Sequence, residues 1–594
     1  MSKPLSHSLF TFVFCSFVLG TLSLCTFTGC ANRGIGPQGG PKDSIPPVPL
    51  KSDPEIGALN FHGKRIEVTF DEYIELNDVV SNMLMSPPQQ KAPDVKARGK
   101  RLIVQFQDSL RDSTTYTIDF GDAVCDFRER VPLHGYSFYF STGDEIDTLD
   151  TRGKVYNAEN LNPCKGLIVG IHRDMADSAF TSSPFLRIAK TDSAGFFRIG
   201  NIHPGMYRLY AVDDVSRDYR LTIGESLAFA DDPIHVQPRD TADTTAAPQT
   251  ALFLFKEEQK KLYLQRTQRD QQHRVLVSFS ASPDSLPVVR PLYEDSLNYH
   301  IHFSAKGDTM TIWLTDSMSI WRDSLFFEAR YRRTDSLYRL EWTTDTLRAI
   351  WRAPRLSAKA KETQEKQRQS RRLELTTNAR KGFEIFDTIR LQCTTPLASI
   401  ERDSIHLFER IDTVLHPIPF TILPYDTLPM SIVFAAELKP QGAYVLQLDS
   451  GALHDIYGVT HIAANYGLQV KNISDYSTIR VKITPFDARA RIQLLNAKDV
   501  VVRELPAAED GAFFEYLKPD TYYLRLYIDA NGDGKWTTGS WDEKRQPELV
   551  YYFPQNVQTK SNWDFEEEWN YTLIPQTKAK PKELIKASAN AKKK

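Results

Sequence analysis

The sequence predicts an all-β protein made of β-sandwich modules that follow one another along the chain. Short runs of alternating apolar and polar residues recur over most of the 594 residues, and a period of two is typical of strands with one buried face. Aromatic residues, which favour strands, make up 11% of the chain. Asp-Ser pairs, as at Asp108, Asp284 and Asp335, separate the runs in the manner of turns.

Charge and cysteine content disfavour two classes of protein, those that bind nucleic acid and those held together by a disulfide framework. The chain has 73 basic and 75 acidic residues and a net charge of −2, so nothing in the composition favours a nucleic-acid partner. Six cysteines occur; Cys15 and Cys25 lie in the leader described next and Cys30 ends it. The remaining three, Cys125, Cys164 and Cys393, lie in separate segments, so a disulfide framework is not expected.

Residues 1–30 have the layout of an export signal. Lys3 precedes a long apolar stretch, and Thr28, Gly29 and Cys30 follow it, which is the order of a charged region, an apolar region and a cleavage site. The ending resembles a bacterial lipobox, with Phe27 where Leu is usual. A lipid such as palmitate on Cys30 would anchor the chain to a membrane without crossing it. A transmembrane helix is the alternative reading of the same stretch.

Residues 31–49, rich in Gly and Pro, predict an unpacked tether. Residues 50–143 then alternate at 65–70, 101–106, 116–120 and 136–140, which predicts a sandwich. With the tether motif at 39–43, these runs resemble Bacteroidota lipoproteins whose N-terminal unit is a bacterial Ig-like domain of the S-layer (SbsA) type. That resemblance implies no catalytic residues.

A second kind of module is predicted at 149–233. Asp192-Ser193-Ala194-Gly195 is a turn into a strand, and Pro204-Gly205 is a turn into the next one. This segment is similar to the transthyretin-like, or carboxypeptidase-regulatory-like, sandwich. The pattern from Gly195 to Asp213 returns from Gly511 to Asp529, with its glycine, aromatic pair, turn and final Asp. An internal repeat of this kind predicts a related module at 474–570.

The remaining segments complete the row. Residues 250–353 predict a further β-sandwich, 354–372 a polar linker, 373–471 a second Ig-like sandwich, and 571–594 a disordered basic tail. The predicted fold is therefore all-β, with tandem Ig-like and transthyretin-like β-sandwiches.

One loop could hold a metal. Asp529, Asn531 and Asp533 place oxygen side chains at alternate positions, and Gly534 follows them, as at the start of an EF-hand calcium loop. The twelfth position is Ser540 rather than Glu, although Asp542 or Glu543 could supply the missing carboxylate. A metal-free turn closed by Asx side chains is the alternative.

Aromatic residues are dense from 541 to 569. Trp541, Tyr552 and Trp569 could form an exposed platform for a sugar or a protein, or they could fill a sandwich core. An exposed platform would place Trp541 and Trp569 together on the surface.

No catalytic motif was found, so the chain is expected not to be an enzyme. The expected function is that of a lipid-anchored binding or scaffolding subunit in an outer-membrane assembly, with a protein partner. The alternative is a surface lipoprotein that binds glycans through its C-terminal aromatic residues. Ala31, Asn32 and Arg33 lack the acidic run associated with surface export in Bacteroidota, which favours the periplasmic side.

Overall fold

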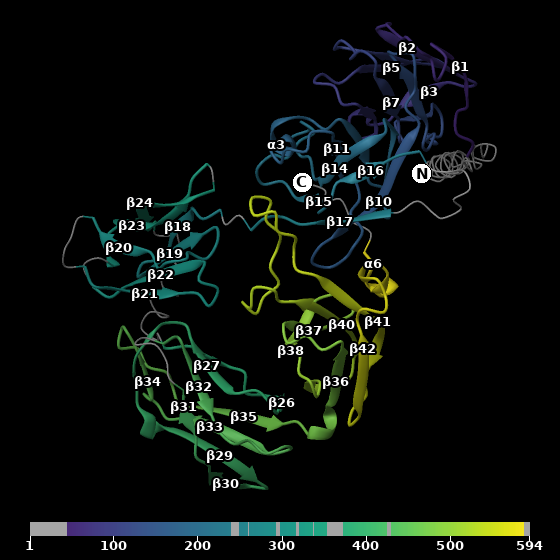
Figure 1. Ribbon diagram of the computed structural model, residues 1–594. Coiled ribbons are helices and arrows are strands. Elements are labelled where there is room, and N and C mark those ends of the chain that lie inside the picture. The colour runs from purple at the N-terminus through teal and green to yellow at the C-terminus, as the bar shows by residue number, and fades with distance from the viewer. Residues whose placement is uncertain are drawn as a thin grey trace, which may run out of the picture. The chain divides into compact units, whose positions relative to one another are not determined.

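The computed structural model describes residues 44–238, 249–258, 261–292, 297–316, 320–336, 338–352, 372–423 and 429–586. The chain divides into two compact units, 1–147 and 148–594, which are described separately. Nearly all regular structure in these residues is strand (Figure 1), so the all-β prediction is confirmed.

The first unit is one sandwich, here called the first module. One sheet has the order β1-β2-β6-β5, a second has β4-β7-β9, and β3 pairs with β8. The strand bounds are Pro49–Asp53, Arg65–Phe70, Ile74–Leu76, Leu84–Ser86, Asp94–Arg98, Arg101–Gln105, Thr115–Asp119, Val124–Asp126 and Ser137–Ser141, with a helical turn α2 at Val79–Asn82. Alternate residues of these strands meet inside, where Phe70, Tyr116, Phe120, Phe138 and Phe140 are buried, as period-two alternation requires.

The second module has two facing sheets, β13-β10-β17 and β12-β11-β14-β15, with β16 also paired to β14. The bounds of β10 to β17 are Leu149–Asn157, Ile168–His172, Arg187–Lys190, Phe196–Ile202, Gly205–Val212, Leu227–Phe229, Ile234–Val236 and Gln249–Leu254, and α3 spans Ala179–Ser182. Because β17 pairs with β10 in parallel, this module extends beyond the predicted end at 233. Local pattern cannot reveal such a pairing, since the two strands are almost 100 residues apart.

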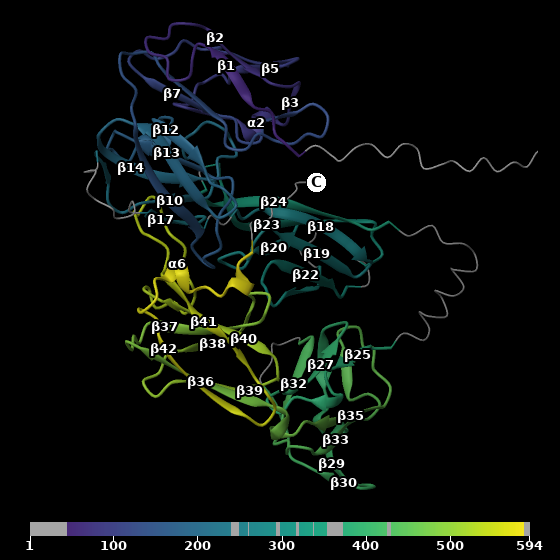
Figure 2. The ribbon, with the colours of Figure 1, turned by 90° about the vertical axis from the view of Figure 1, so that its right-hand side faces the viewer.

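The third module therefore begins after 250, the predicted start. Its sheets are β18-β19-β22-β21 and β20-β23-β24, and all of these strands except β21 are labelled in Figure 2. The bounds of β18 to β24 are Leu264–Gln271, Arg274–Phe279, Val288–Pro291, Tyr299–Phe303, Thr309–Leu314, Ser324–Thr334 and Leu340–Ile350.

The fourth module has the sheets β25-β27-β32-β31 and β26-β35-β33-β29-β30, and β28 pairs with β34. The bounds of β25 to β35 are Leu375–Thr377, Lys381–Phe383, Ile389–Cys393, Leu397–Ile400, Ile405–Ile411, Val414–Pro417, Thr421–Ile422, Ser431–Ala435, Ala443–Leu448, Leu453–Asp455 and Ala464–Val470; the turn η1 spans Arg402–Ser404 and η2 Ile473–Asp475.

The fifth module has the sheets β39-β36-β42 and β38-β37-β40-β41. The bounds of β36 to β42 are Ser477–Thr484, Ala490–Leu495, Val501–Pro506, Ala512–Leu517, Thr521–Ile528, Val550–Gln558 and Asp564–Asn570, followed by α6 at Gln576–Ala579 and η3 at Lys582–Leu584. The predicted disordered tail is wrong over its described part, because Ala579, Lys580 and Leu584 are buried.

Sheet order shows that the chain contains a duplication. The order β13-β10-β17, with its parallel β10–β17 pair, matches β39-β36-β42 with its parallel β36–β42 pair. The order β1-β2-β6-β5 with β3-β8 likewise matches β25-β27-β32-β31 with β28-β34. The fourth and fifth modules thus repeat the first and second in topology, and the third lies between the two pairs in the sequence.

The same tyrosine contacts recur in the repeats. The Tyr116 hydroxyl accepts a hydrogen bond from Arg111 N, and Tyr444 accepts one from Lys439 N. Tyr207 donates to the His203 carbonyl, and Tyr522 to the Lys518 carbonyl. Each hydroxyl at the edge of its core satisfies a backbone group in a tight loop.

Candidate binding sites

The predicted aromatic platform is absent, because the three rings fill interiors instead of facing solvent. Trp541, Tyr552 and Trp569 are only 8%, 1% and 3% exposed. Trp569 packs in the fifth module's core against Phe553, with ring centroids 5.7 Å apart. Tyr552 belongs to a different cluster. Aromatic density alone could not distinguish the two alternatives, since core and platform use the same residues.

Trp541 joins two modules that lie far apart in the sequence. It belongs to the loop between β40 and β41, and its ring meets Phe180, Tyr210 and Phe229 of the second module edge-on, at 5.0, 5.7 and 5.4 Å. Its backbone N–H donates to the Glu257 carboxylate at 2.6 Å. Trp541 is therefore the buried residue that holds this loop on the second module.

A cation covers the same ring. The Lys544 ammonium lies 3.1 Å from the centroid of the Trp541 ring, close enough for a cation–π interaction. Burial lowers the pKa of Lys544, and the Asp177 carboxylate, 3.8 Å away, opposes that shift. The contact adds an electrostatic attraction to the apolar packing of Trp541.

The predicted calcium residues form a turn closed by hydrogen bonds. Asp529 Oδ1 accepts from the backbone N–H groups of Gly532 and Asp533, and Oδ2 accepts from Gly534. Asn531 Oδ1 accepts from Asp533 N, and its amide donates to Asp533 Oδ2 at 3.2 Å. Asp529 is buried and Asp533 is exposed. The three oxygen-bearing side chains thus lie on one loop, and calcium there stays a prediction.

Glu548, which the sequence did not single out, is the carboxylate that the fold brings to this loop. Its oxygens accept from Ala530 N at 2.7 Å and Thr537 N at 2.9 Å. Burial raises the pKa of Glu548, and the nearby Asp529 charge raises it further. Within the described part of the chain, Asp542 and Glu543 form no hydrogen bond with Asp529, Asn531 or Asp533. Glu548 is 19 positions after Asp529, beyond the reach of a 12-residue motif.

A buried ion pair fastens the C-terminal segment. The Lys580 ammonium contacts Asp499 at 2.7 Å, and the two side chains are 3% and 6% exposed. It also donates to the Asn160 carbonyl and to Asn162 Oδ1 of the second module. The Tyr552 hydroxyl donates to the other Asp499 oxygen. Burial lowers the pKa of Lys580, while Asp499 raises it.

A second buried carboxylate joins the fourth and fifth modules. Glu384 accepts from Lys471 at 3.0 Å, from the Tyr476 hydroxyl at 2.6 Å, and lies 2.8 Å from the Lys518 ammonium. Burial raises the pKa of Glu384, but the Lys518, Tyr476 and Lys471 donors outweigh it and leave the pKa at about 2. This carboxylate stays ionised throughout the physiological range.

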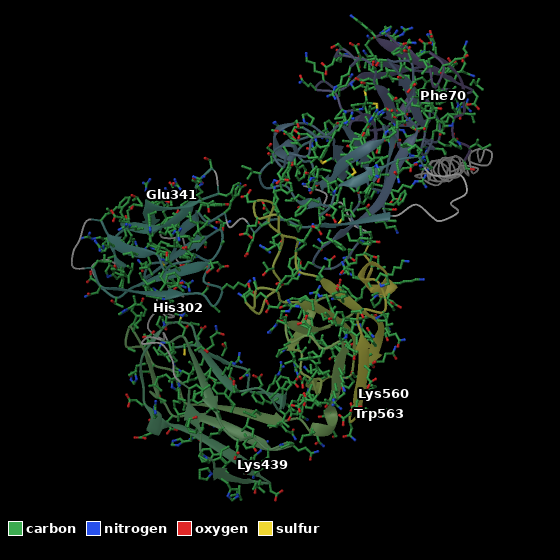
Figure 3. The ribbon with its side chains drawn as sticks, in the orientation of Figure 1. Phe70, His302, Glu341, Lys439, Lys560 and Trp563 are labelled. Atoms are coloured by element: carbon green, nitrogen blue, oxygen red, sulfur yellow. The ribbon has the colours of Figure 1, made fainter. Side chains whose placement is uncertain are left out.

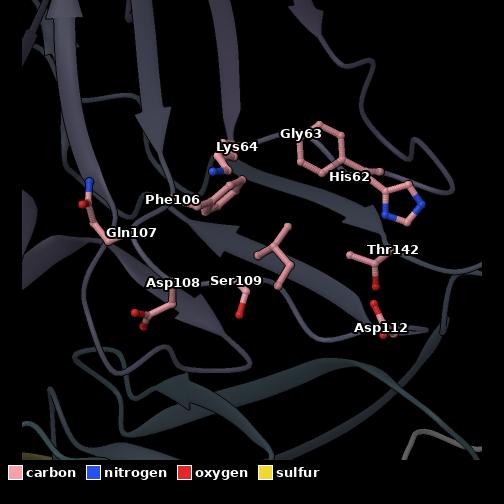
Figure 4. Close-up of a pocket in the computed structure, with 11 residues that line it drawn as sticks. His62, Gly63, Lys64, Phe106, Gln107, Asp108, Ser109, Asp112 and Thr142 are labelled. Carbon is pink, nitrogen blue, oxygen red and sulfur yellow. The ribbon is translucent and has the colours of Figure 1, made fainter.

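The first module contains a cavity of about 350 Å³ (Figure 4). Phe61, Phe106 and Leu110 supply apolar lining, and His62, Lys64, Asp108 and Asp112 supply polar groups. Asp108 already accepts a hydrogen bond from Lys91 N. The lining is therefore a small pocket that mixes apolar and polar groups.

The predicted lipidation residue, Cys30, lies outside the described residues. Among those that are described, no helix is long and apolar enough to cross a membrane. No group of three or more His, Cys, Asp or Glu suited to a metal occurs in the described part of the chain. Cys125, Cys164 and Cys393 are free thiols.

The whole chain resembles solved structures only weakly. Tandem Ig repeats of Dlar are 11% identical, covering 36% of this chain and 98% of that chain, with a TM-score of 0.13. The major pilin subunit BcpA of Bacillus cereus is 7% identical over 71% and 99%, with a TM-score of 0.12. Surface layer protein SbsC, domains 1–6, is 8% identical over 84% and 67%, with a TM-score of 0.13. Scores this low carry no argument about function.

The first module has a clearer relationship. No curated protein matches the chain. Residues 43–142, which span the first module, match the bacterial Ig-like domain.

Proposed function

We propose that this chain is a non-enzymatic lipoprotein of the cell envelope that serves as a scaffolding or binding subunit of an outer-membrane assembly. The main support is the way the fifth module is joined to two others. Trp541 and Lys580 attach it to the second module, and Glu384 attaches it to the fourth. Buried, hydrogen-bonded joints of this kind suit a subunit that holds partners at set positions.

The anchor in this proposal is a lipid on Cys30, followed by the Gly- and Pro-rich segment that leads to the first module. A bacterial Ig-like domain at 43–142 and the repeated sandwiches behind it are consistent with a surface or structural role, although fold alone does not assign function. We place the modules on the periplasmic side of the outer membrane.

The test is affinity purification of the tagged full chain from detergent-solubilised membranes. Cys30→Ala removes the proposed lipidation site, and Cys25→Ala is the matched control in the same leader. We expect labelled palmitate and a stoichiometric outer-membrane protein to be retained in Cys25→Ala and lost in Cys30→Ala. A chain that stays in the membrane fraction but recovers no partner would contradict the subunit role. Cleavage by protease added to intact cells would contradict the periplasmic placement.

A further inference from the structure

The third module carries one exposed sheet face that is rich in arginine. In β20, β23 and β24 alternate residues such as Val289, Phe327 and Leu347 are buried in the core. The intervening residues lie on the opposite face, where most of them are exposed. Figure 2 shows this sheet beside its partner sheet of β18, β19 and β22.

Strand register places the residues of this face in rows. The first row contains Arg332 and Trp342, and the second contains Val288, Arg330 and Thr344. The third row contains Arg290, Glu328 and Thr346, and the fourth contains Phe326 and Arg348. Rows two residues apart on a strand are separated by about 7 Å, and neighbouring strands by about 4.8 Å. The face is therefore a broad grid of positive, hydroxyl and aromatic groups.

Three of the arginines are available to a ligand. Arg290, Arg330 and Arg348 are exposed, and the described residues offer none of them an ion pair. Arg332 is already paired, 2.6 Å from Asp284. Glu328, the one carboxylate among the rows, is half-buried between Arg290 and Thr346. Positive charge therefore predominates on the open surface.

An exposed tryptophan adjoins these charges. Trp342 is 54% exposed, and the Arg330 guanidinium lies 5.2 Å from its ring centroid. The ring leaves a flat apolar surface in solvent, and Thr344 and Thr346 place two exposed hydroxyls along the same strand. Guanidinium groups bind carboxylates through two parallel hydrogen bonds, while aromatic rings and hydroxyls suit the apolar and polar faces of a sugar.

We propose that this face, made of Arg290, Arg330, Arg348, Trp342, Thr344 and Thr346, binds an anionic polysaccharide. A repeating acidic sugar offers carboxylates to successive arginines and ring faces to Trp342, which an isolated small anion does not. The inference is independent of the lipid anchor and of the outer-membrane partner.

A second exposed tryptophan supplies the control. Trp563 is 58% exposed, and the Lys560 ammonium lies 5.4 Å from its ring centroid (Figure 3). The strand that follows it, β42, presents Asp564, Glu566 and Glu568 as exposed residues. An anionic ligand is repelled there, so Trp563 matches Trp342 in exposure and in its neighbouring cation but not in the charge of the surface.

The experiment measures binding of the detergent-solubilised full chain to sodium alginate, a carboxylate polysaccharide, with neutral dextran as the uncharged probe. The variants are Arg330→Gln/Arg348→Gln, Trp342→Ala and Trp563→Ala. We expect alginate binding that weakens with added salt and no dextran binding. The double variant should lose roughly tenfold or more in affinity because two charge-assisted contacts disappear. Trp342→Ala should lose several-fold, and Trp563→Ala should equal the wild type.

Four outcomes would overturn the proposal. They are no alginate binding by the wild type, equal binding of dextran, an equal loss in Trp563→Ala, and undiminished binding in both the double variant and Trp342→Ala. Phosphatidylglycerol vesicles and a DNA oligonucleotide are tested at the same ionic strength. Tighter binding to either one, lost in the double variant, would reassign the face to membrane or nucleic acid. All the substituted side chains are exposed, and circular dichroism checks that each variant retains its strand content.

Discussion

The Glu384 carboxylate is contacted by donor groups from two modules. It lies just after β26 in the fourth module, whereas Tyr476 and Lys518 belong to the fifth. Removing any one donor leaves a buried charge less well compensated, and that is more costly than losing an exposed ion pair. The residue therefore links the protonation state of one side chain to the joint between two modules.

We predict that acid weakens this joint. The pKa of Glu384 is about 2 in the folded chain, below its ordinary value of 4.5. A group with a depressed folded pKa stabilises the fold above its unfolded pKa, and that stability is lost as pH falls toward the folded pKa. The contribution, at most roughly 3 kcal/mol, should be complete at pH 6 and decline between about pH 4.5 and pH 2.

The measurement is urea unfolding of the wild type and Glu384→Gln at several pH values. The difference in unfolding free energy between them should shrink as pH falls below the ordinary Glu range. Glu509→Gln is the control, because Glu509 is exposed on a loop of the fifth module. A difference between wild type and Glu384→Gln that does not change with pH would show that the carboxylate's charge does not act at this joint.

At the scale of elements, the sequence predicts the positions of strands and turns whose signal lies within the element itself. The repeat from Gly195 to Asp213 and from Gly511 to Asp529 corresponds to two couples of consecutive strands, β13 with β14 and β39 with β40, whose members lie in different sheets. Alternation located β2, β6, β7 and β9 of the first module within a residue or two. In each case the signal, an apolar period or a turn, lies within the element itself.

What the sequence could not reveal depends on long-range contacts. The sequence predicts β17 as part of the third module, because nothing local reveals that its partner β10 lies almost 100 residues earlier. The segment 576–586 reads as a basic tail, yet Lys580 is buried against Asp499 and Leu584 packs with Tyr523 and Tyr552. For the same reason Trp541 could not be assigned to a core: the rings that cover it come from the second module.

The β40–β41 loop carries the calcium prediction. If the ion binds through Asp529, Asn531 and Asp533, calcium should raise the melting temperature in a concentration-dependent manner, since a ligand that binds only the native state stabilises it. Asp533→Asn removes a charge from an exposed ligand and should reduce this rise. Asp542→Asn, an exposed carboxylate on the same loop, should leave it intact. An equal melting temperature with calcium and with chelator would identify a metal-free turn.

We predict that Trp541 determines whether the same loop stays docked. Trp541→Ala removes a buried ring from between Phe180, Tyr210 and Phe229, and a buried Trp-to-Ala change costs about 3–5 kcal/mol. Cleavage of the 530–548 loop by a protease should become faster, because docking no longer protects it. Trp563→Ala removes an exposed ring from the same module and should not change the cleavage rate. Equal protection of the loop in both variants would contradict this role for Trp541.

Within the unit 148–594, the fifth module contacts two other modules, the fourth and the second. Glu384 joins it to the fourth module, and Trp541 and Lys580 join it to the second, which lies more than 300 residues earlier. The C-terminal segment therefore connects two modules that are not consecutive in the sequence. A substitution near residue 580 should also change the stability of the structure near residue 160.

Lys580→Ala tests this coupling. The substitution leaves Asp499 buried without its cation, a change that typically costs about 3–5 kcal/mol, and it removes the donors to Asn160 and Asn162. Amide hydrogen exchange should quicken in 576–585 and also in 157–162. Lys578→Ala, an exposed lysine two residues away, should change neither segment. Adding Asp499→Asn removes the unpaired charge and should restore part of the protection. Faster exchange confined to 576–585 would mean that the segment unfolds alone and that Lys580 does not hold the second module.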